Sequence, residues 1–184
     1  MKQIFKLGLF IATLNFLTDC NGQTKTESNQ NEIKTDKNKL IGGGCDGCEL
    51  MYVGMPKVIS SEHTSNGWDE GKQKLILTGK VFQLDGRTPA SDVVIYYWHT
   101  DDSGLYSSND QTPKQAKEHG KLRGWVKSDK SGNYTIKTSR PDAYPNDNIP
   151  QHIHLSIKEP DIINEYYADL YFDDDPLYLK HKKK

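Results

Sequence analysis

Turn-forming residue pairs interrupt this chain about every ten residues from Leu40 onward. Glycine, proline, asparagine and aspartate dominate these pairs because they accept the backbone angles that tight turns require. The composition, with Gly 15, Pro 8 and Tyr 10, points in the same direction, away from a coiled coil or a helical bundle. We therefore expect many short strands joined by turns. The pairs are Asn66-Gly67, Asp85-Gly86, Ser103-Gly104, Ser131-Gly132 and Pro145-Asn146.

The segments between these turns have the composition of strands. Lys74–Leu84 alternates apolar and polar residues, and Val93–His99 is β-branched and aromatic. Two further runs flank Ser131-Gly132, as in a hairpin. We predict an all-β fold, either an antiparallel β-sandwich or a small barrel, with a single helical turn at Gln115–Gly120. The predicted strands are Lys74–Leu84, Val93–His99, Gly124–Ser128, Asn133–Thr138, His152–Lys158 and Tyr166–Phe172.

The first 20 residues have the pattern of a secretory signal. A basic start is followed by an apolar run from Leu7 to Leu17, and then by Cys20. A cysteine at the cleavage site resembles a bacterial lipoprotein, in which lipid is attached to that residue. We predict that residues 1–19 are a signal peptide and that Cys20 anchors an exported protein to the cell envelope. The alternative is a periplasmic or secreted protein in which Cys20 is an unmodified thiol.

The predicted organisation is a disordered tether over residues 20–40, followed by one folded domain over residues 41–184. The tether is nearly free of large apolar residues, so burial cannot offset the entropy of ordering it. The formal net charge of -1 lacks the basic excess that binding to nucleic acid needs. No apolar run reaches the ~18 residues of a spanning helix, so we expect membrane contact only through a lipid anchor.

Two cysteines, Cys45 and Cys48, follow three consecutive glycines. In an exported chain we expect them to form a disulfide that closes a tight loop. A redox or soft-metal role and a pair of free thiols are the alternatives. The chain has no second cysteine pair with which to complete a zinc site.

The motif His152-Ile153-His154 lies within a predicted strand. Because side chains alternate along a strand, both imidazoles project from one face while Ile153 points to the other. Such a pair either binds a metal or serves a structural role near the core.

Six short motifs occur in one order along the chain and together resemble the intradiol ring-cleavage dioxygenases, the family of catechol 1,2-dioxygenase and protocatechuate 3,4-dioxygenase. The similarity covers Leu75 to Asp175 and implies an antiparallel β-sandwich of the transthyretin-like type. The motifs are Thr78-Gly79-Lys80-Val81, Trp98-His99 with Gly104-Leu105-Tyr106, Arg123-Gly124, Asp129 to Tyr134, Pro141 to Pro145, and His152-Ile153-His154.

The resemblance implies a ferric ion, Fe(III), held by Tyr106, Tyr144, His152 and His154. Ferric iron is a hard acid that favours anionic oxygen, and a bound metal can ionise a phenol whose ordinary pKa is about 10. The implied substrates are a catechol-type aromatic and O2, and the ring is cleaved between its two hydroxylated carbons to a muconate-type diacid. Tyr144 is, by its position, the ligand that the substrate displaces and that takes a proton. Arg123 is a second candidate catalytic residue, either as a source of positive charge or as a brace beneath the site.

Two positions depart from the family pattern. Ile149 stands where the family has an arginine three residues before the first histidine, and Asp169 stands near a position where a glutamine is usual. The alternative at Ile149 is that Arg140 or Arg123 supplies the positive charge from another direction. The loss of the arginine favours a second hypothesis, a non-catalytic transthyretin-like binding module with a decayed or re-purposed metal site. A third hypothesis is a copper-handling protein that uses the cysteine pair with His152 and His154. The identity of the catechol and the oligomeric state stay open.

Overall fold

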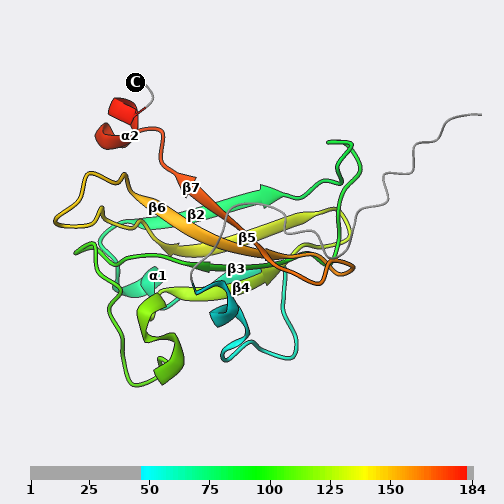
Figure 1. The fold of residues 1–184 in the computed structure, drawn as a ribbon, viewed down its shortest axis with the longest axis horizontal. Helices are drawn as coiled ribbons and strands as arrows, with labels where there is room; N and C mark the ends of the chain where they lie inside the picture. The colour runs from blue at the N-terminus through cyan, green and yellow to red at the C-terminus, as the bar shows by residue number, and fades with distance from the viewer. Residues whose placement is uncertain (1–46, 182–184) are drawn as a thin grey trace, which may run out of the picture. The chain divides into compact units, whose positions relative to one another are not determined.

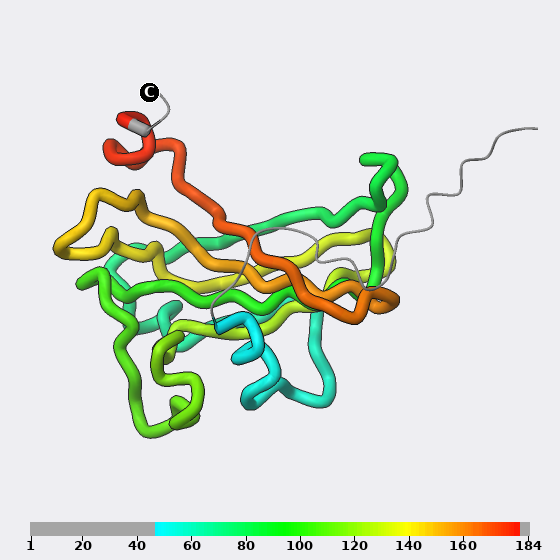
Figure 2. The backbone as a smooth tube through the Cα atoms, viewed as in Figure 1, coloured from blue at the N-terminus to red at the C-terminus, as the bar shows by residue number. Residues whose placement is uncertain are grey.

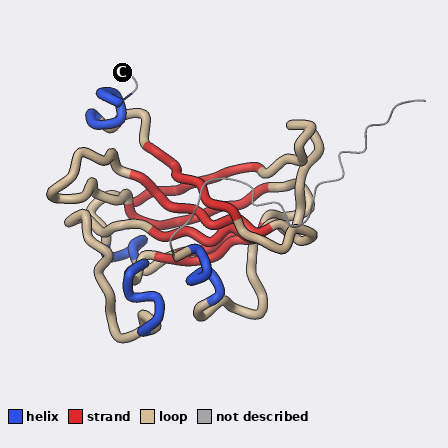
Figure 3. Tube along the Cα trace, viewed as in Figure 1, coloured by secondary structure: helices blue, strands red, loops and turns tan. Residues whose placement is uncertain are grey.

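The computed structural model describes residues 47–181, which form two sheets with short helices around them (Figures 1 and 3). The predicted signal peptide, the tether and the residues Cys20 and Cys45 lie outside the described residues, so those predictions stay untested. The elements in chain order are η1 (Cys48–Tyr52), β1 (Glu62–Thr64), α1 (Gly67–Glu70), β2 (Lys74–Lys80), β3 (Val94–Trp98), η2 (Lys114–His119), β4 (Arg123–Lys127), β5 (Asn133–Ser139), β6 (His152–Lys158), β7 (Tyr166–Tyr171) and α2 (Pro176–His181).

The strands form a three-stranded sheet in the order β1-β5-β2 and a four-stranded sheet in the order β4-β3-β6-β7. Every pairing is antiparallel except that of β1 with β5, which is parallel. The predicted all-β sandwich is therefore confirmed. No helix within residues 47–181 has both the length and the apolar character that crossing a membrane requires.

The predicted strands agree with the observed ones except at their ends. The run from Lys74 was predicted to reach Leu84, but β2 ends at Lys80. Beyond it the carboxylate of Asp85 accepts the backbone N–H groups of Arg87 and Thr88, so these groups serve a turn instead of a ladder. The helical turn expected at Gln115–Gly120 is the 3-10 helix η2.

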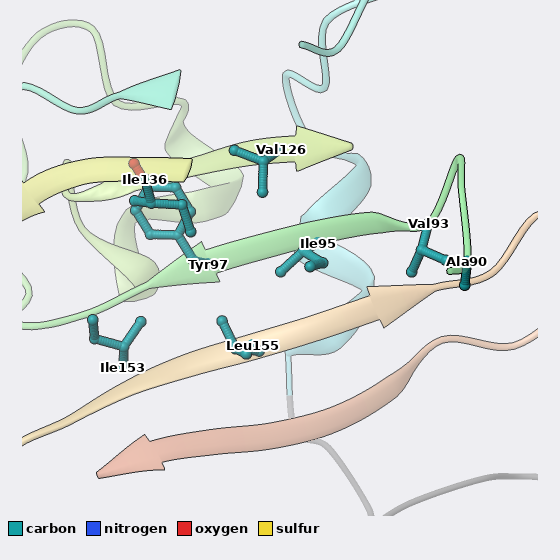
Figure 4. Close-up of a cluster of buried hydrophobic side chains, with 8 residues drawn as sticks. All are labelled: Ala90, Val93, Ile95, Tyr97, Val126, Ile136, Ile153 and Leu155. Carbon is teal, nitrogen blue, oxygen red and sulfur yellow. The ribbon is translucent and has the colours of Figure 1, made fainter. Parts of the chain in front are cut away.

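The hydrophobic core lies between the two sheets and contains the side chains from one face of each central strand. Ile95 and Tyr97 of β3 and Ile153 and Leu155 of β6 lie buried there, and Ile136 of β5 packs against them from the other sheet (Figure 4). Because side chains alternate, the residues between them must point to the opposite face of the four-stranded sheet. This alternation places both histidines of His152-Ile153-His154 on that opposite face.

A second apolar cluster covers the opposite face. Met51 of η1 packs there against Tyr96 and Trp98, all three buried. The indole Nε1 of Trp125 donates to the Met51 carbonyl at 2.7 Å. Cys48 of the same helix is buried and disulfide-bonded. Cys45 lies outside the described residues, so the pairing of these two cysteines stays a prediction.

Two buried histidines make folding stability depend on pH. His99 and His119 are 1% and 4% exposed, and burial lowers the pKa of each to about 4. An unfolded histidine titrates near pH 6.5, so between about pH 6.5 and about pH 4 the unfolded chain binds protons that the folded one does not. We expect the free energy of unfolding to fall through this window as pH falls, by roughly 1.4 kcal/mol per pH unit for each histidine.

Urea unfolding at pH 7, 6 and 5 measures this slope. In His119→Gln the amide can still bond the Tyr96 hydroxyl, which lies 2.9 Å from the imidazole Nδ1 in the wild type. That variant should have a shallower slope because one titrating group is gone. An unfolding free energy that stays constant from pH 7 to pH 5 would contradict the prediction.

Candidate metal centre

Two phenols and two imidazoles converge on one face of the four-stranded sheet. The Tyr106 hydroxyl lies 2.5 Å from the Tyr144 hydroxyl and 2.7 Å from His154 Nε2. The Tyr144 hydroxyl lies 3.3 Å from Nε2 of both His152 and His154, and these two nitrogens are 3.1 Å apart. The structure therefore brings together all four residues that the sequence singled out as metal ligands.

The two tyrosines reach the site from different loops. Tyr106 follows β3 and Tyr144 precedes β6, and these strands are antiparallel, with Trp98 opposite His154. The end of β3 and the start of β6 thus lie at the same end of the sheet, where Figure 2 shows both connecting segments. Convergence follows from the topology and not from closeness in the sequence.

Hydrogen bonds join the two tyrosine loops to each other. The Thr100 hydroxyl donates to the Asp142 carbonyl at 2.6 Å, and the Asp142 N–H donates to the Asp101 carbonyl at 3.1 Å. Gly104 has φ 72°, and a Cβ there would overlap the carbonyl oxygen of Ala143. A glycine is therefore needed for the two loops to approach this closely.

Each histidine is oriented through its other ring nitrogen. His152 Nδ1 lies 2.7 Å from the Pro150 carbonyl, and His154 Nδ1 lies 2.7 Å from Asp169 Oδ1. Both partners are acceptors, so both Nδ1 atoms carry the proton and both Nε2 atoms are left with a lone pair. The two Nε2 atoms lie 3.1 Å apart beside the Tyr106 and Tyr144 hydroxyls, which can donate to them while no metal is bound. This arrangement fits a bound metal ion.

Burial shapes the acidity of the cluster. Burial raises the pKa of Tyr106, and the bond to Tyr144 and the charge of Asp169 raise it further. Burial also raises the pKa of Tyr144, against a lowering contribution from the Tyr106 bond. Burial lowers the pKa of His152. Both phenols and this imidazole are therefore neutral near pH 7 in the absence of a metal, and a cation would have to ionise the phenols itself.

Asp169 belongs to the site although it is not one of the four predicted ligands. His152, His154 and Asp169 form a group that could hold a metal by the spacing of their ligand atoms. Asp169, however, bonds the Nδ1 side of His154, whereas both phenols lie on the Nε2 side. We therefore place Asp169 behind the ligand, where a carboxylate fixes the ring and raises its basicity.

Two further tyrosines surround Asp169. The Tyr167 hydroxyl lies 2.5 Å from Asp169 Oδ1 and 2.6 Å from His154 Nδ1, and the Tyr171 hydroxyl lies 3.2 Å from Asp169 Oδ2. Burial acts to raise the pKa of Asp169, but the bonds from His154 and Tyr167 outweigh it and lower that pKa, so the carboxylate is ionised. Sequence reasoning missed both tyrosines, although positions 167, 169 and 171 share one face of β7 by alternation.

We expect Asp169→Asn to weaken metal binding by about tenfold, because the amide oxygen still accepts from His154 but the negative charge is lost. Competition with a chelator of known affinity measures the change. Asp173→Asn is the matched control, since it removes an exposed carboxylate from the same segment. Equal metal affinity of wild type and Asp169→Asn would contradict the role given to Asp169.

Arg123 does not join this cluster. It lies on β4, and β3 separates β4 from β6, with Trp98 paired to Arg123 on one side and to His154 on the other. Its Nη2 donates to the carbonyls of Val53 and Leu50, and the guanidinium stacks on the rings of Tyr96 and Trp125. These contacts hold the segment around η1 on the sheet and place no arginine atom at the phenols.

A profile of the family described as Dioxygenase matches residues 57–182. Over 95 residues the chain is 30% identical to catechol 1,2-dioxygenase of Acinetobacter baylyi, covering 52% of this chain and 30% of that protein. Over 121 residues it is 29% identical to chlorocatechol 1,2-dioxygenase of Pseudomonas sp. strain P51, covering 55% of this chain and 46% of that protein. The chain thus spans less than half the length of these two curated relatives.

Among solved structures, catechol 1,2-dioxygenase from Pseudomonas arvilla C-1 shares the fold, with a TM-score of 0.54 at 24% sequence identity. The match covers 77% of this chain and 47% of that one.

Proposed function

This chain belongs to the intradiol dioxygenase family, and from that premise we propose that it is an iron(III)-dependent enzyme that cleaves catechol-type aromatic rings with O2. The observation that carries the proposal is the convergence of two phenol oxygens and two imidazole Nε2 atoms, which make five contacts of 2.5 to 3.3 Å with one another. Phenolate oxygen and imidazole nitrogen suit ferric iron, which would ionise the phenols on binding.

In this proposal Tyr106, Tyr144, His152 and His154 hold the ion. Bound ferric iron would serve as a template and Lewis acid that holds both oxygens of the catechol and makes the ring reactive toward O2. The chain itself supplies the orientation of the substrate, the proton acceptor and the exclusion of water.

Tyr144 is the residue best placed to accept a catechol proton at its phenol oxygen. Its contacts to both histidines are 3.3 Å, whereas Tyr106 lies at 2.7 Å from His154 and is held more closely. In the metal-free protein burial raises the pKa of Tyr144, and the carboxylates of Asp169 and Asp147 raise it further. The same surroundings would favour the protonated phenol once Tyr144 leaves the ion, so Tyr144 would take up the proton as the substrate binds.

Trp98 gives the site a rigid floor. The Trp98 ring stacks on the His154 ring with a centroid distance of 4.9 Å. It also stacks on the His119 ring, with a centroid distance of 4.1 Å and an interplanar angle of 7°. Trp98 and His119 are both buried. The stack therefore holds the His154 ring in place and keeps water from one side of it, as a preorganised site requires.

Oxygen uptake by the iron-loaded protein tests the proposal. We expect one O2 consumed per catechol, together with the ultraviolet absorbance of a muconate-type product. A protein that binds catechols with a change in its visible spectrum and consumes no O2 would instead be the non-catalytic binding module. The observation that favours this second function is Ile149, an apolar residue at the position where the family has an arginine.

We also propose, from the sequence, that the protein is exported and carries lipid on Cys20. Expression of Cys20→Ser in a bacterial host should move the protein from the membrane fraction to the soluble fraction. A wild-type protein that is soluble and begins at another residue would contradict the lipid anchor.

A further inference from the structure

We propose that this site selects catechols whose ring substituent is neutral or cationic and discriminates against those that carry a carboxylate. The inference rests on the proposed function, because it assumes that a catechol occupies the site. Its basis is the sign of the charges around the four ligands. Two carboxylates lie around these ligands: Asp169, whose Oδ1 is 2.7 Å from His154 Nδ1, and Asp147, in the turn that follows Tyr144.

The first of these carboxylates is Asp169, which lies behind His154, on the Nδ1 side of its ring. Its side chain is only 18% exposed, and Oδ1 is 2.7 Å from His154 Nδ1. A ferric ion would bring three positive charges, which the phenolates of Tyr106 and Tyr144 and the carboxylate of Asp169 would balance before the substrate binds. Once Tyr144 takes up a proton, the deprotonated catechol oxygens would replace its charge, so the loaded site would keep no net positive charge with which to attract an anionic substituent.

The second carboxylate is Asp147, at the turn that follows Tyr144. The Asp147 N–H donates to the Tyr144 carbonyl at 3.3 Å, so the turn fixes this acid three residues beyond the ligand. Asp147 is exposed and its charge acts on the Tyr144 phenol. A substituent that extends from the ring past Tyr144 would meet a negative charge.

The arginine nearest in sequence to the Tyr144 loop has three of its five N–H donors and its charge engaged by neighbouring side chains. Arg140 donates from Nε to Gln151 Oε1 at 2.8 Å, and from Nη1 and Nη2 to the two oxygens of Asp174 at 2.7 and 2.5 Å. Its guanidinium also lies 4.4 Å from the centre of the Phe172 ring. Arg140 is therefore neutralised by a bidentate ion pair and bonds its neighbours instead of the substrate.

Three exposed residues next to the ligands, in the sequence or in space, carry no charge. Leu105 precedes Tyr106 and is 54% exposed, and Ile149 lies three residues before His152 and is 37% exposed. Tyr171, 44% exposed, has its ring centroid 5.6 Å from that of His152. A carboxylate placed among these groups would lose its hydration without gaining a partner, whereas an alkyl or aryl substituent would lose nothing.

Three catechols that differ only at the end of a short side chain test the proposal: 4-propylcatechol, dopamine and 3-(3,4-dihydroxyphenyl)propionate. In each the substituent is separated from the ring by methylene groups, so ring reactivity is nearly matched. Equilibrium titration of the iron-loaded protein, followed by its visible spectrum, gives the affinities. We expect the propionate to bind at least about tenfold more weakly than dopamine, which corresponds to ~1.4 kcal/mol, with 4-propylcatechol at or near dopamine.

Salt separates charge from shape. If carboxylates cause the order, the difference between dopamine and the propionate should shrink between about 10 mM and about 500 mM NaCl, because salt screens partly exposed charges. If salt leaves this affinity difference unchanged, the shape of the substituent and not its charge would explain the order of affinities, and the proposal would be overturned. Propionate affinity equal to or greater than that of 4-propylcatechol would overturn it as well.

A single substitution should reverse the preference. Ile149→Arg adds a cation beside the ligands at an exposed position, and we expect it to raise propionate affinity by about tenfold and to lower that of dopamine. Ile163→Arg is the matched control, because Ile163 is 65% exposed and lies in the turn between β6 and β7, at the far end of β6 from His152. Equal responses of the two variants would overturn the proposal.

These affinities do not depend on turnover. Ring cleavage of all three catechols without the charge order would leave the proposed function standing and refute the selectivity. Affinities in the expected order without O2 uptake would support the selectivity and refute the proposed function.

Discussion

His152→Ala and His154→Ala should each lose tight iron binding while the β-sandwich stays folded. The two Nε2 atoms are 3.1 Å apart and each offers a free lone pair, so either substitution removes one of four ligands. Loss of a ligand should cost more than the loss of a group behind it, so we expect a fall in affinity of more than about 100-fold. The fold should persist because β6 is paired along its length to β3 and to β7 by backbone hydrogen bonds.

Iron content after desalting and far-ultraviolet circular dichroism measure the two parts of this result. His63→Ala is the control, because His63 lies on β1 of the other sheet and bonds the Tyr97 hydroxyl at 2.8 Å. It should keep its iron. Unchanged iron content in either of the two site variants would refute the ligand assignment.

Local pattern was enough to predict the strands and the shared face of the two histidines. In β6 the period-two alternation buries Ile153 and Leu155 in the core. The side chains of His152 and His154 therefore project from the other face. The two runs that flank Ser131-Gly132 were predicted to form a hairpin. They are the strands β4 and β5, but these belong to different sheets, so the predicted hairpin is wrong. A tight turn brings two strands close but does not decide which edge each one joins.

Long-range contacts decide what the local pattern cannot. The meeting of Tyr106 with Tyr144 depends on the bond from Thr100 to Asp142 and on the absence of a side chain at Gly104. Neither contact can be inferred from spacing, and only the resemblance to a family pointed to the pair. The strand β1 was not predicted, for a similar reason. It has only three residues, and they form a strand by pairing in parallel with β5, which is distant in the sequence.

The role of Asp169 depends on register. Asp169 stands opposite His154, and Tyr171 opposite His152, in the pairing of β6 with β7. A shift of one residue would turn these side chains to the core. The sequence indicates alternation within β7, but the seven-residue connection over residues 159–165 sets the register, and its length does not correspond to one turn type.

The removal of one phenol oxygen at a time should separate metal binding from chemistry. Tyr106→Phe and Tyr144→Phe each keep the aromatic ring, so the packing of the two rings, with centroids 6.0 Å apart, should survive. Each variant removes one of the four ligands, as the histidine variants do. We therefore expect weaker iron binding in both, and the weaker of the two in Tyr106→Phe because the Tyr106 hydroxyl has the shorter contacts, at 2.5 and 2.7 Å.

Both variants should lose part of the visible absorbance that phenolate-to-iron charge transfer produces, and ring cleavage should fall by about 10²–10³-fold. In Tyr144→Phe we expect catechol binding to be the step that is weakened most. This variant lacks the phenol oxygen that accepts a catechol proton and that the catechol displaces from the ion. Tyr52→Phe is the control, since its hydroxyl bonds Glu165 at 3.1 Å and lies outside the cluster. Should Tyr144→Phe cleave catechols at the wild-type rate, Tyr144 would be a ligand without a role in proton transfer, and the base would have to be sought among groups other than these two phenols.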